Sequence, residues 1–221
     1  MSNKHDISLT EAYSVQSPED NIRLYANWAE TYDTDFVEKE GYIAYLGPAN
    51  QLLKNKSDIS GPVLDVGCGT GVVGVVLHEG GIDTVDGVDI SEEMLAQSRK
   101  KLSSKGQAVY RNLMLADLTQ SIDIADNVYA GIVSAGTFTH GHLKPESLDE
   151  LWRVAEPGAF CSIGINPDHF KQQGFEDKIN ADVAAGKIRD PKIVQTQAYA
   201  IKREDGDPGN DVSLVLVCRV I

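Results

Sequence analysis

Short apolar runs alternate with amphipathic helical patterns along most of the chain, from Gly61 to the C-terminus. Strand-like runs occupy residues 62–66, 84–89, 107–115, 128–134, 160–165, 193–202 and 212–221. Helical patterns occupy residues 72–78, 91–104, 145–155 and 168–186, and the third carries Leu148, Leu151, Trp152 and Ala155 at i, i+3, i+4 and i+7. This alternation predicts a doubly wound α/β fold, in which helices cover both faces of a mostly parallel, seven-stranded sheet.

The last two strand-like runs are joined by a short glycine- and proline-containing stretch, residues 206–210. A connection that short between strands produces an antiparallel hairpin. We therefore expect the sheet to end in a C-terminal antiparallel hairpin.

Composition narrows the classes of function. The 221 residues are 42% hydrophobic, which suits one domain of ordinary size. With 20 Lys and Arg against 33 Asp and Glu, the net charge is −13, and such a surface repels phosphate backbones. Nucleic acid is therefore not an expected partner.

No apolar run approaches the ~18–20 residues of a membrane span, and the polar first 20 residues lack a signal-peptide core. The three cysteines, Cys68, Cys161 and Cys218, are widely spaced and include no CxxC pair. That pattern argues against a disulfide framework or a zinc site and suits a reducing compartment. We expect a cytoplasmic protein with no membrane partner and no metal.

The segment from Val63 to Gly71 reads VLDVGCGTG, a strand that runs into a glycine-rich turn at the start of a helix. Such a turn lets a ligand lie against the backbone, and the helix-start amides face that ligand. Gly69, Gly71 and Gly74 also satisfy the dinucleotide pattern GxGxxG, which keeps an NAD(P)-dependent oxidoreductase as an alternative. Two features favour a methyl donor: the Asp65 carboxylate suits a cationic ligand better than a pyrophosphate, and Gly67 begins the turn early.

This segment resembles the first motif of class I S-adenosylmethionine-dependent methyltransferases, a Rossmann-like family, and the similarity runs from about Trp28 to Ile165. The resemblance implies S-adenosylmethionine as cofactor and S-adenosylhomocysteine as product. It assigns Asp89 to the ribose hydroxyls, which suit a carboxylate with two acceptor oxygens. The remaining cofactor contacts that we expect are Gly67 and Gly69 in the turn, Ile90, Met94, Asp117 and Leu118 around the adenine, and the strand-end backbone near Ser134 and Ala135 at the methionine amino group.

Residues 28–33 read WAETYD and resemble the "WA..YD" helix of a group that includes the Williams–Beuren-region methyltransferase-like proteins. Trp28 and Tyr32 are i, i+4 neighbours and present one aromatic face. In that group the helix folds over the methionine end of the cofactor, so we expect both residues to contact it. Aromatic faces near the sulfonium would add about 1–2 kcal/mol of cation–π attraction.

Ser17, Pro18 and the acids that follow predict a helix start. We divide the chain into a polar N-terminal tail (1–17), a helical cap over the cofactor site (18–57) and a methyltransferase core (58–221). Residues 167–190 of that core could form a substrate lid.

The acceptor side is expected in the loops that follow the fourth and fifth strands. His140 is the candidate general base, because imidazole titrates near neutral pH. The other candidate substrate-binding residues are Phe138, Asn166, His169 and Phe170. His140 and His142 form a His-x-His pair with no third ligand visible, so metal is not expected.

The leading hypothesis is methylation of a small molecule at an O, N, S or C atom. Residues 134–137 read SAGT in place of the Asn/Asp-Pro-Pro-aromatic motif of nucleic-acid amino-methyltransferases, which disfavours N6-adenine methylation. A non-catalytic S-adenosylmethionine-binding protein stays open as an alternative. Methylation of a protein side chain lacks a recognisable docking surface in the sequence, and the oligomeric state is not indicated.

Overall fold

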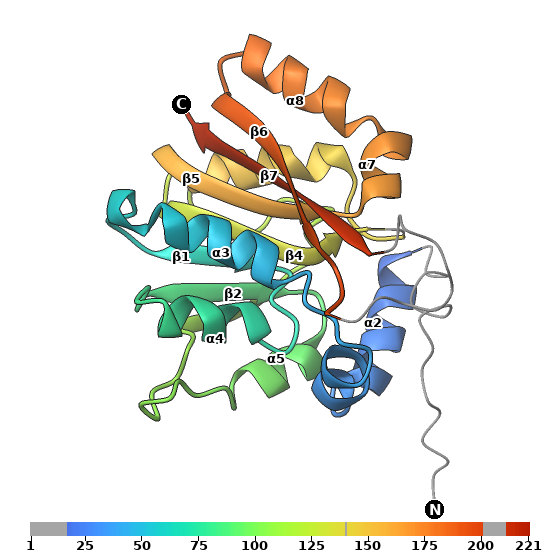
Figure 1. The fold of residues 1–221 in the computed structure, drawn as a ribbon. Helices are drawn as coiled ribbons and strands as arrows, with labels where there is room; N and C mark the ends of the chain where they lie inside the picture. The colour runs from blue at the N-terminus through green and yellow to red at the C-terminus, as the bar shows by residue number, and fades with distance from the viewer. Residues whose placement is uncertain (1–16, 140, 201–210) are drawn as a thin grey trace, which may run out of the picture.

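A computed structural model of the protein describes residues 17–139, 141–200 and 211–221. Its seven-stranded sheet has the order β3-β2-β1-β4-β5-β7-β6 (Figure 1). The strands are β1 (Val63–Val66), β2 (Val85–Asp89), β3 (Asn112–Leu115), β4 (Tyr129–Phe138), β5 (Ala155–Ile165), β6 (Ile188–Gln197) and β7 (Val212–Val220). Neighbouring strands from β3 to β5 are parallel, and β7 is antiparallel to both β5 and β6. The predicted α/β fold with a C-terminal hairpin is confirmed.

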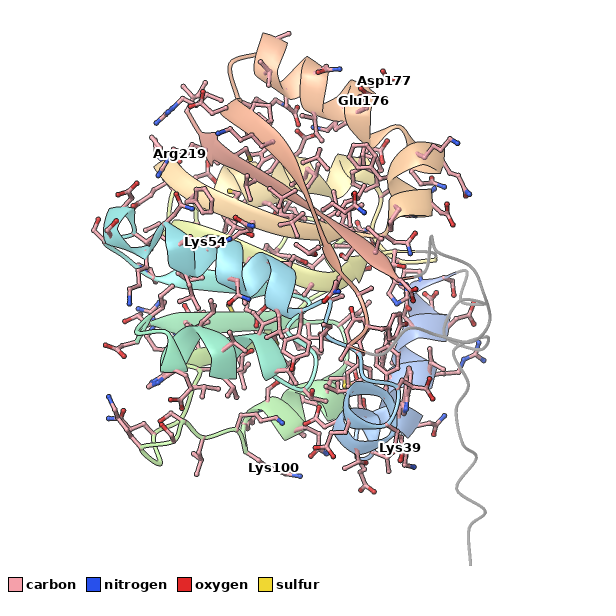
Figure 2. All side chains as sticks on the ribbon, viewed as in Figure 1. Lys39, Lys54, Lys100, Glu176, Asp177 and Arg219 are labelled. Carbon is pink, nitrogen blue, oxygen red and sulfur yellow. The ribbon has the colours of Figure 1, made fainter. Side chains whose placement is uncertain are left out.

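Helices cover both faces of this sheet. One face carries α3 (Leu46–Lys54), α4 (Val72–Glu79) and α5 (Glu92–Ser98), whose side chains share an apolar cluster with β1, β2 and β4. The other face carries α6 (Leu148–Val154), α7 (Pro167–Gln173) and α8 (Phe175–Ala184), packed over a second cluster. Charged side chains such as Lys39, Lys100 and Glu176 are exposed at the periphery (Figure 2). Burial on both faces explains why the central strands are mostly apolar.

The helix that the sequence predicts to begin after Ser17, and to continue to about residue 40, is divided into two helices. The first is α2 (Pro18–Trp28), where the Ser17 side chain accepts a hydrogen bond from the Asp20 amide at 3.2 Å, as the capping pattern predicts. The second is the π-helix η1 (Tyr32–Glu38). Short 3₁₀ turns follow at η2 (Lys56–Asp58) and η3 (Pro145–Ser147). The next helix, α3, lies in the predicted cap by sequence but packs against β4 and β5.

Several predicted boundaries were wrong. The helix expected at 168–186 is divided into α7 and α8, because Gly174 adopts a left-handed conformation with φ of +78°. The strand expected at 107–115 is only β3, whereas β6 begins five residues before the expected 193. Pro157 and Gly158, between the helix expected at 145–155 and the strand expected at 160–165, fall inside β5, where the pairing with β4 changes register.

The strand order positions the site. The chain runs outward from β1 to β3 on one side and from β4 onward on the other, so β1 and β4 are neighbours at the switch point. Ligands of open α/β sheets bind at the carboxyl ends of such strands. Figure 1 shows α2 at this end of the sheet.

Candidate cofactor and acceptor site

The larger cavity, of about 630 Å³, lies at the carboxyl ends of β1 to β4. Its lining comes from successive strand ends and from α2: Gly67 and Gly69 of the glycine loop, Asp89 and Ile90 after β2, Met94 of α5, residues 117–121 after β3, residues 135–137 of β4, residues 141–144, and Pro18, Asn21 and Tyr25 of α2. Eight of the eleven predicted cofactor residues, including Tyr32, therefore line one cavity. We call it the cofactor cavity.

Gly69 supplies the open backbone of this cavity. Its φ is +54°, and a Cβ built on it would meet no atom within 4 Å. A ligand can therefore lie against the main chain at this position. The Ser98 hydroxyl donates to the Gly69 carbonyl at 2.5 Å and holds the loop against α5.

Asp89 connects the end of β2 to the glycine loop. Its carboxylate accepts hydrogen bonds from the amides of Gly69, at 2.8 Å, and Ser91, at 2.9 Å. Burial raises the pKa of Asp89, and these backbone hydrogen bonds oppose the rise. A carboxylate fixed by backbone amides on the cavity wall suits a pair of adjacent hydroxyl donors.

Asp65 is fully buried beneath the glycine loop and is not among the residues that line the cavity. Its Oδ2 accepts a hydrogen bond from the Tyr110 hydroxyl at 2.6 Å, while its Oδ1 has no partner in the described structure. Burial raises the pKa of Asp65 to about 7, the Tyr110 hydrogen bond lowers it, and Asp89 raises it further. An unsatisfied buried carboxylate oxygen beside the loop fits a cationic ammonium group.

Tyr110 is a residue that the sequence did not reveal. Besides donating to Asp65, its hydroxyl accepts a hydrogen bond from the Gly74 amide at 3.2 Å. A Cβ on Gly74 would lie 2.4 Å from the Tyr110 ring. The third glycine of the GxGxxG pattern is thus explained by packing against Tyr110. A tyrosine inside the strand predicted at 107–115 gave no signal of this role.

The residues that the resemblance assigned to the adenine line one part of the cavity. Asp117 lies after β3, and its Oδ1 accepts hydrogen bonds from the amide and hydroxyl of Thr119 at 2.8 and 2.7 Å. Leu118 and Met94 are buried and Ile90 is half-buried, and all three line the cavity. An apolar slot with the Asp117 carboxylate at its edge suits a flat base that carries an amino donor, and Glu146, Asp149 and Glu150 also line the cavity.

Besides Asp65, two predicted cofactor residues have side chains that do not line this cavity. Ser134 is buried within the sheet, where its hydroxyl donates to the Val66 carbonyl at 2.8 Å, because the alternation of the strand turns its side chain away from the cavity. Ala135 and Gly136 line the cavity in its place. Trp28 is buried in an aromatic cluster with Phe36 and lines a second cavity instead.

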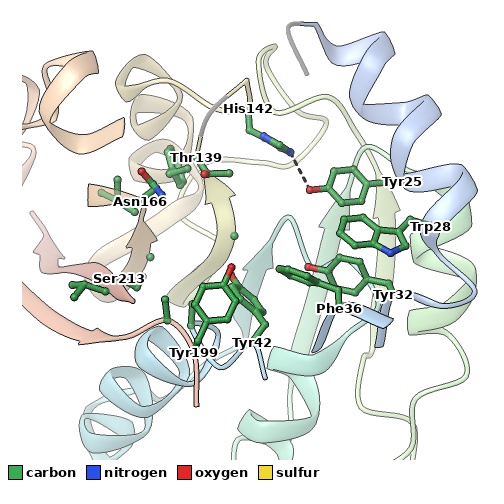
Figure 3. Close-up of a pocket in the computed structure, with 17 residues that line it drawn as sticks. Tyr25, Trp28, Tyr32, Phe36, Tyr42, Thr139, His142, Asn166, Tyr199 and Ser213 are labelled. Atoms are coloured by element: carbon green, nitrogen blue, oxygen red, sulfur yellow. Dashed lines mark hydrogen bonds between the residues drawn. The ribbon is translucent and has the colours of Figure 1, made fainter. Parts of the chain in front are cut away.

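That second cavity, of about 90 Å³, adjoins the first, and we call it the aromatic cavity. Six aromatic side chains line it: Tyr25, Trp28, Tyr32, Phe36, Tyr42 and Tyr199. Figure 3 shows Thr139, Asn166 and Ser213 on the opposite side from Tyr25 and Trp28. Four residues line both cavities, namely Tyr25, Tyr32, Gly136 and His142, so these mark the boundary between them.

The predicted acceptor residues divide into three groups. Phe138 and Asn166 line the aromatic cavity. His169 and Phe170 do not: His169 is buried with Nε2 2.8 Å from the Leu143 carbonyl oxygen, and Phe170 stacks on Phe175 of the core. Their position after β5 was right, but their side chains face the sheet. His140 lies outside the described residues.

His142 is the described histidine at the boundary. Its Nε2 lies 3.1 Å from the Tyr25 hydroxyl oxygen, as the dashed line in Figure 3 marks. No residue of 167–190, all of which the structure describes, lines either cavity. That segment inserts Phe175 and Ile179 into the core, and its role as a lid stays a prediction.

Asp33 connects the N-terminal helical cap to the glycine loop through its side-chain contacts. Its Oδ1 accepts a hydrogen bond from the Thr70 hydroxyl at 2.5 Å, and its Oδ2 forms an ion pair with Lys101. The aspartate that ends the WAETYD segment therefore holds η1 against the loop. Its place in that motif was the available signal, although no role was predicted for it.

Among the residues that the structure describes, no group of three His, Cys, Asp or Glu side chains could hold a metal ion. The same residues contain no helix with the length and apolar character needed to cross a membrane. All three cysteines are free and buried.

Comparisons with known proteins agree with this geometry. Residues 63–158 match the family model described as a methyltransferase domain. The chain is 26% identical over 158 residues to methyltransferase-like protein 27 of Homo sapiens, covering 69% of this chain and 60% of that protein. It is 27% identical over 159 residues to the putative methyltransferase YqeM of Bacillus subtilis (strain 168), covering 72% and 62%. The chain thus spans about three fifths of the length of these relatives.

Among solved structures, the fold resembles the N-methyltransferase NodS from Bradyrhizobium japonicum WM9, which was determined in complex with S-adenosylhomocysteine. The TM-score is 0.62 at 14% identity, and the match covers 88% of this chain and 96% of that one. The likeness extends over nearly the whole fold.

Proposed function

Because the chain belongs to the class I S-adenosylmethionine-dependent methyltransferases, whose cofactor is S-adenosylmethionine, we propose that it methylates a small molecule at an O, N, S or C atom. The acceptor binds in the aromatic cavity, and S-adenosylhomocysteine is the second product. The observation that carries this proposal is the shared boundary of the two cavities, formed by Tyr25, Tyr32, Gly136 and His142.

The residues of the cofactor cavity fit the cofactor. Asp89 would hold the ribose hydroxyls, Asp117 and Leu118 the adenine, and the unpartnered Oδ1 of Asp65 would face the methionine ammonium. The bound cofactor supplies an activated methyl group on a sulfonium. The chain then mainly has to hold the acceptor in line with that group, and orientation can contribute up to ~7–11 kcal/mol to lowering the barrier.

A small acceptor is supported by the size and surroundings of the aromatic cavity. Its volume of about 90 Å³ suits a compact group, not a folded chain. The net charge of −13 disfavours nucleic acid as acceptor. The three buried free cysteines suit a reducing compartment, and we propose a cytoplasmic location for that reason.

The test is turnover with a methyl-labelled cofactor and pooled small amines, thiols, phenols and carboxylic acids. We expect label in one acceptor class, together with S-adenosylhomocysteine. If the protein binds S-adenosylmethionine but labels no acceptor, it is a non-catalytic cofactor-binding protein and the proposal fails.

A further inference from the structure

We propose that the aromatic cavity selects an amine that arrives as a cation, and that the Tyr25–His142 pair takes up the proton which this amine releases before it is methylated. The inference rests on the proposed function and names its acceptor class.

The six aromatic rings form one continuous wall. Successive ring centroids along this wall lie 4.6–6.2 Å apart, in the order Tyr25, Trp28, Tyr32, Phe36, Tyr42 and Tyr199. The chain brings them together from α2, η1 and the segments beside the C-terminal hairpin (Figure 3). A wall of this kind presents several negative ring faces to one small volume.

Formal charge is missing from the wall. Among the described residues that line the aromatic cavity, there is no Lys, Arg, Asp or Glu. An anionic acceptor would therefore be desolvated without a counter-ion, which is costly. A desolvated cation, by contrast, is stabilised by the ring quadrupoles.

The surroundings add negative potential. Burial raises the pKa of Tyr32 well above its ordinary value, and neighbouring groups that include Asp33 raise it further, so Tyr32 stays a neutral phenol. The net charge of −13 also raises the local concentration of cations around the protein.

The polar end of the cavity lies at its boundary with the cofactor cavity. His142 lines both, and its Nε2 is 3.1 Å from the Tyr25 hydroxyl oxygen. An imidazole can accept a proton near neutral pH. The ammonium gives one proton to this pair, and the freed nitrogen lone pair forms the bond to the methyl carbon. The carbon–sulfur bond breaks with its electron pair left on sulfur, so charge and atoms balance.

The first test is binding, which needs no turnover. With S-adenosylhomocysteine saturating, choline is titrated against its neutral isostere 3,3-dimethylbutan-1-ol, and tryptophan fluorescence is followed. Trp28 lines the cavity, whereas the other tryptophan, Trp152, is buried in the core against Asp182. We expect choline to bind at least about tenfold more tightly, since 1.4 kcal/mol corresponds to a factor of ten.

Equal or tighter binding of the neutral alcohol would overturn the amine inference and indicate an apolar acceptor. Failure of both probes while S-adenosylhomocysteine still binds would also overturn it, but would leave the proposed function standing. Failure of S-adenosylhomocysteine itself to bind would overturn the proposed function and this inference with it.

Two variants of Tyr42 provide a matched control. Tyr42 is half-buried and does not line the cofactor cavity. Tyr42→Phe keeps the ring and should leave choline affinity within about twofold, whereas Tyr42→Leu should lower it about five- to tenfold. Neither should change the affinity for S-adenosylhomocysteine or for the neutral alcohol. An equal loss of choline affinity in both variants would contradict the role of the ring.

The proton step has its own test. His142→Gln should lower the turnover of an amine acceptor more than about tenfold while choline affinity stays within about threefold. Unchanged turnover would remove His142 from the proton step. Lost choline binding in a folded variant would instead make His142 part of the binding wall and overturn its role as proton acceptor.

Discussion

The two adjoining cavities differ in the chemistry of the residues that form them. The cofactor cavity has buried carboxylates at strand ends and beneath its loop, each fixed by a hydrogen bond, as Asp89 is by the Gly69 amide. The aromatic cavity has rings and no formal charge among its described lining residues, and these come from helices and from segments far apart in sequence. Fixed charges can recognise one ligand with defined donor groups, whereas rings recognise a shape and a charge sign. We therefore propose that residues at the strand ends determine cofactor binding, and that the surrounding aromatic residues determine the acceptor class.

The largest expected effect concerns Asp65, whose pKa is raised to about 7 by burial. An unfolded aspartate titrates near ~4, so the folded state holds its proton between about pH 4 and 7 while the unfolded state loses it. Stability of the cofactor-free protein must fall as the pH rises through that window. Asp65→Asn should remove this loss and stabilise the protein at pH 8 by roughly 2–4 kcal/mol, measured by denaturant unfolding.

Asp86 in β2 is another buried carboxyl, and it is the control for which the pKa shift has the opposite sign. Burial raises the pKa of Asp86, but hydrogen bonds from Arg111 and Tyr129 outweigh this and lower it. Asp86→Asn should destabilise the protein at pH 8, and the difference should shrink as the pH falls below 4. If Asp65→Asn destabilises the protein at pH 8 as Asp86→Asn does, burial does not raise the pKa of Asp65 as described.

The next effect is on the cofactor alone. Asp89→Ala should weaken S-adenosylmethionine binding by about 1.5–3 kcal/mol, because hydrogen bonds to a charged group are lost. Calorimetry measures it, with Asp83→Ala as control, since Asp83 is exposed on the loop before β2. Choline binding in the aromatic cavity should not change. Unchanged cofactor affinity would rule out the ribose assignment.

Alanine substitutions at two glycines distinguish the effect of backbone strain from the effect of a lost ligand contact. Gly69 and Gly106 both have positive φ, at +54° and +75°, and a Cβ on either would meet no atom within 4 Å. Alanine at either position should cost roughly 1–2 kcal/mol of stability. Only Gly69→Ala should lower cofactor affinity, by about fivefold or more, in a binding titration. Equal affinities in the two variants would mean that no ligand approaches the loop.

The smallest effect is expected from Tyr110→Phe, which keeps the ring against Gly74 and removes the hydroxyl. The net loss should be about 0.5–1.5 kcal/mol of stability. Because the Tyr110 hydrogen bond lowers the pKa of Asp65, the stability change assigned to Asp65 should move to higher pH. The pH series of unfolding, repeated in this variant, measures the shift, and an unmoved transition would contradict the link.

The sequence predicted what local patterns control. Glycines with positive φ, and acids at the ends of parallel strands, occupy defined places once the strands are known, so Asp89, Asp117 and Gly69 lie where expected. The direction in which a side chain points could not be predicted from these patterns, as His169 and Phe170 show. Tyr110, Tyr42 and Tyr199 could not be found, because only tertiary packing brings them to the site.

The most direct test is calorimetric titration with S-adenosylmethionine, and separately with NADH and NADPH, in two buffers of different ionisation enthalpy near pH 6.5. We expect the methyl donor alone to bind, with release of up to about one proton, since an ammonium beside Asp65 lowers the pKa of that carboxyl from about 7. Binding of a nicotinamide cofactor in its place would contradict the assignment of the glycine loop and of the chemistry built on it.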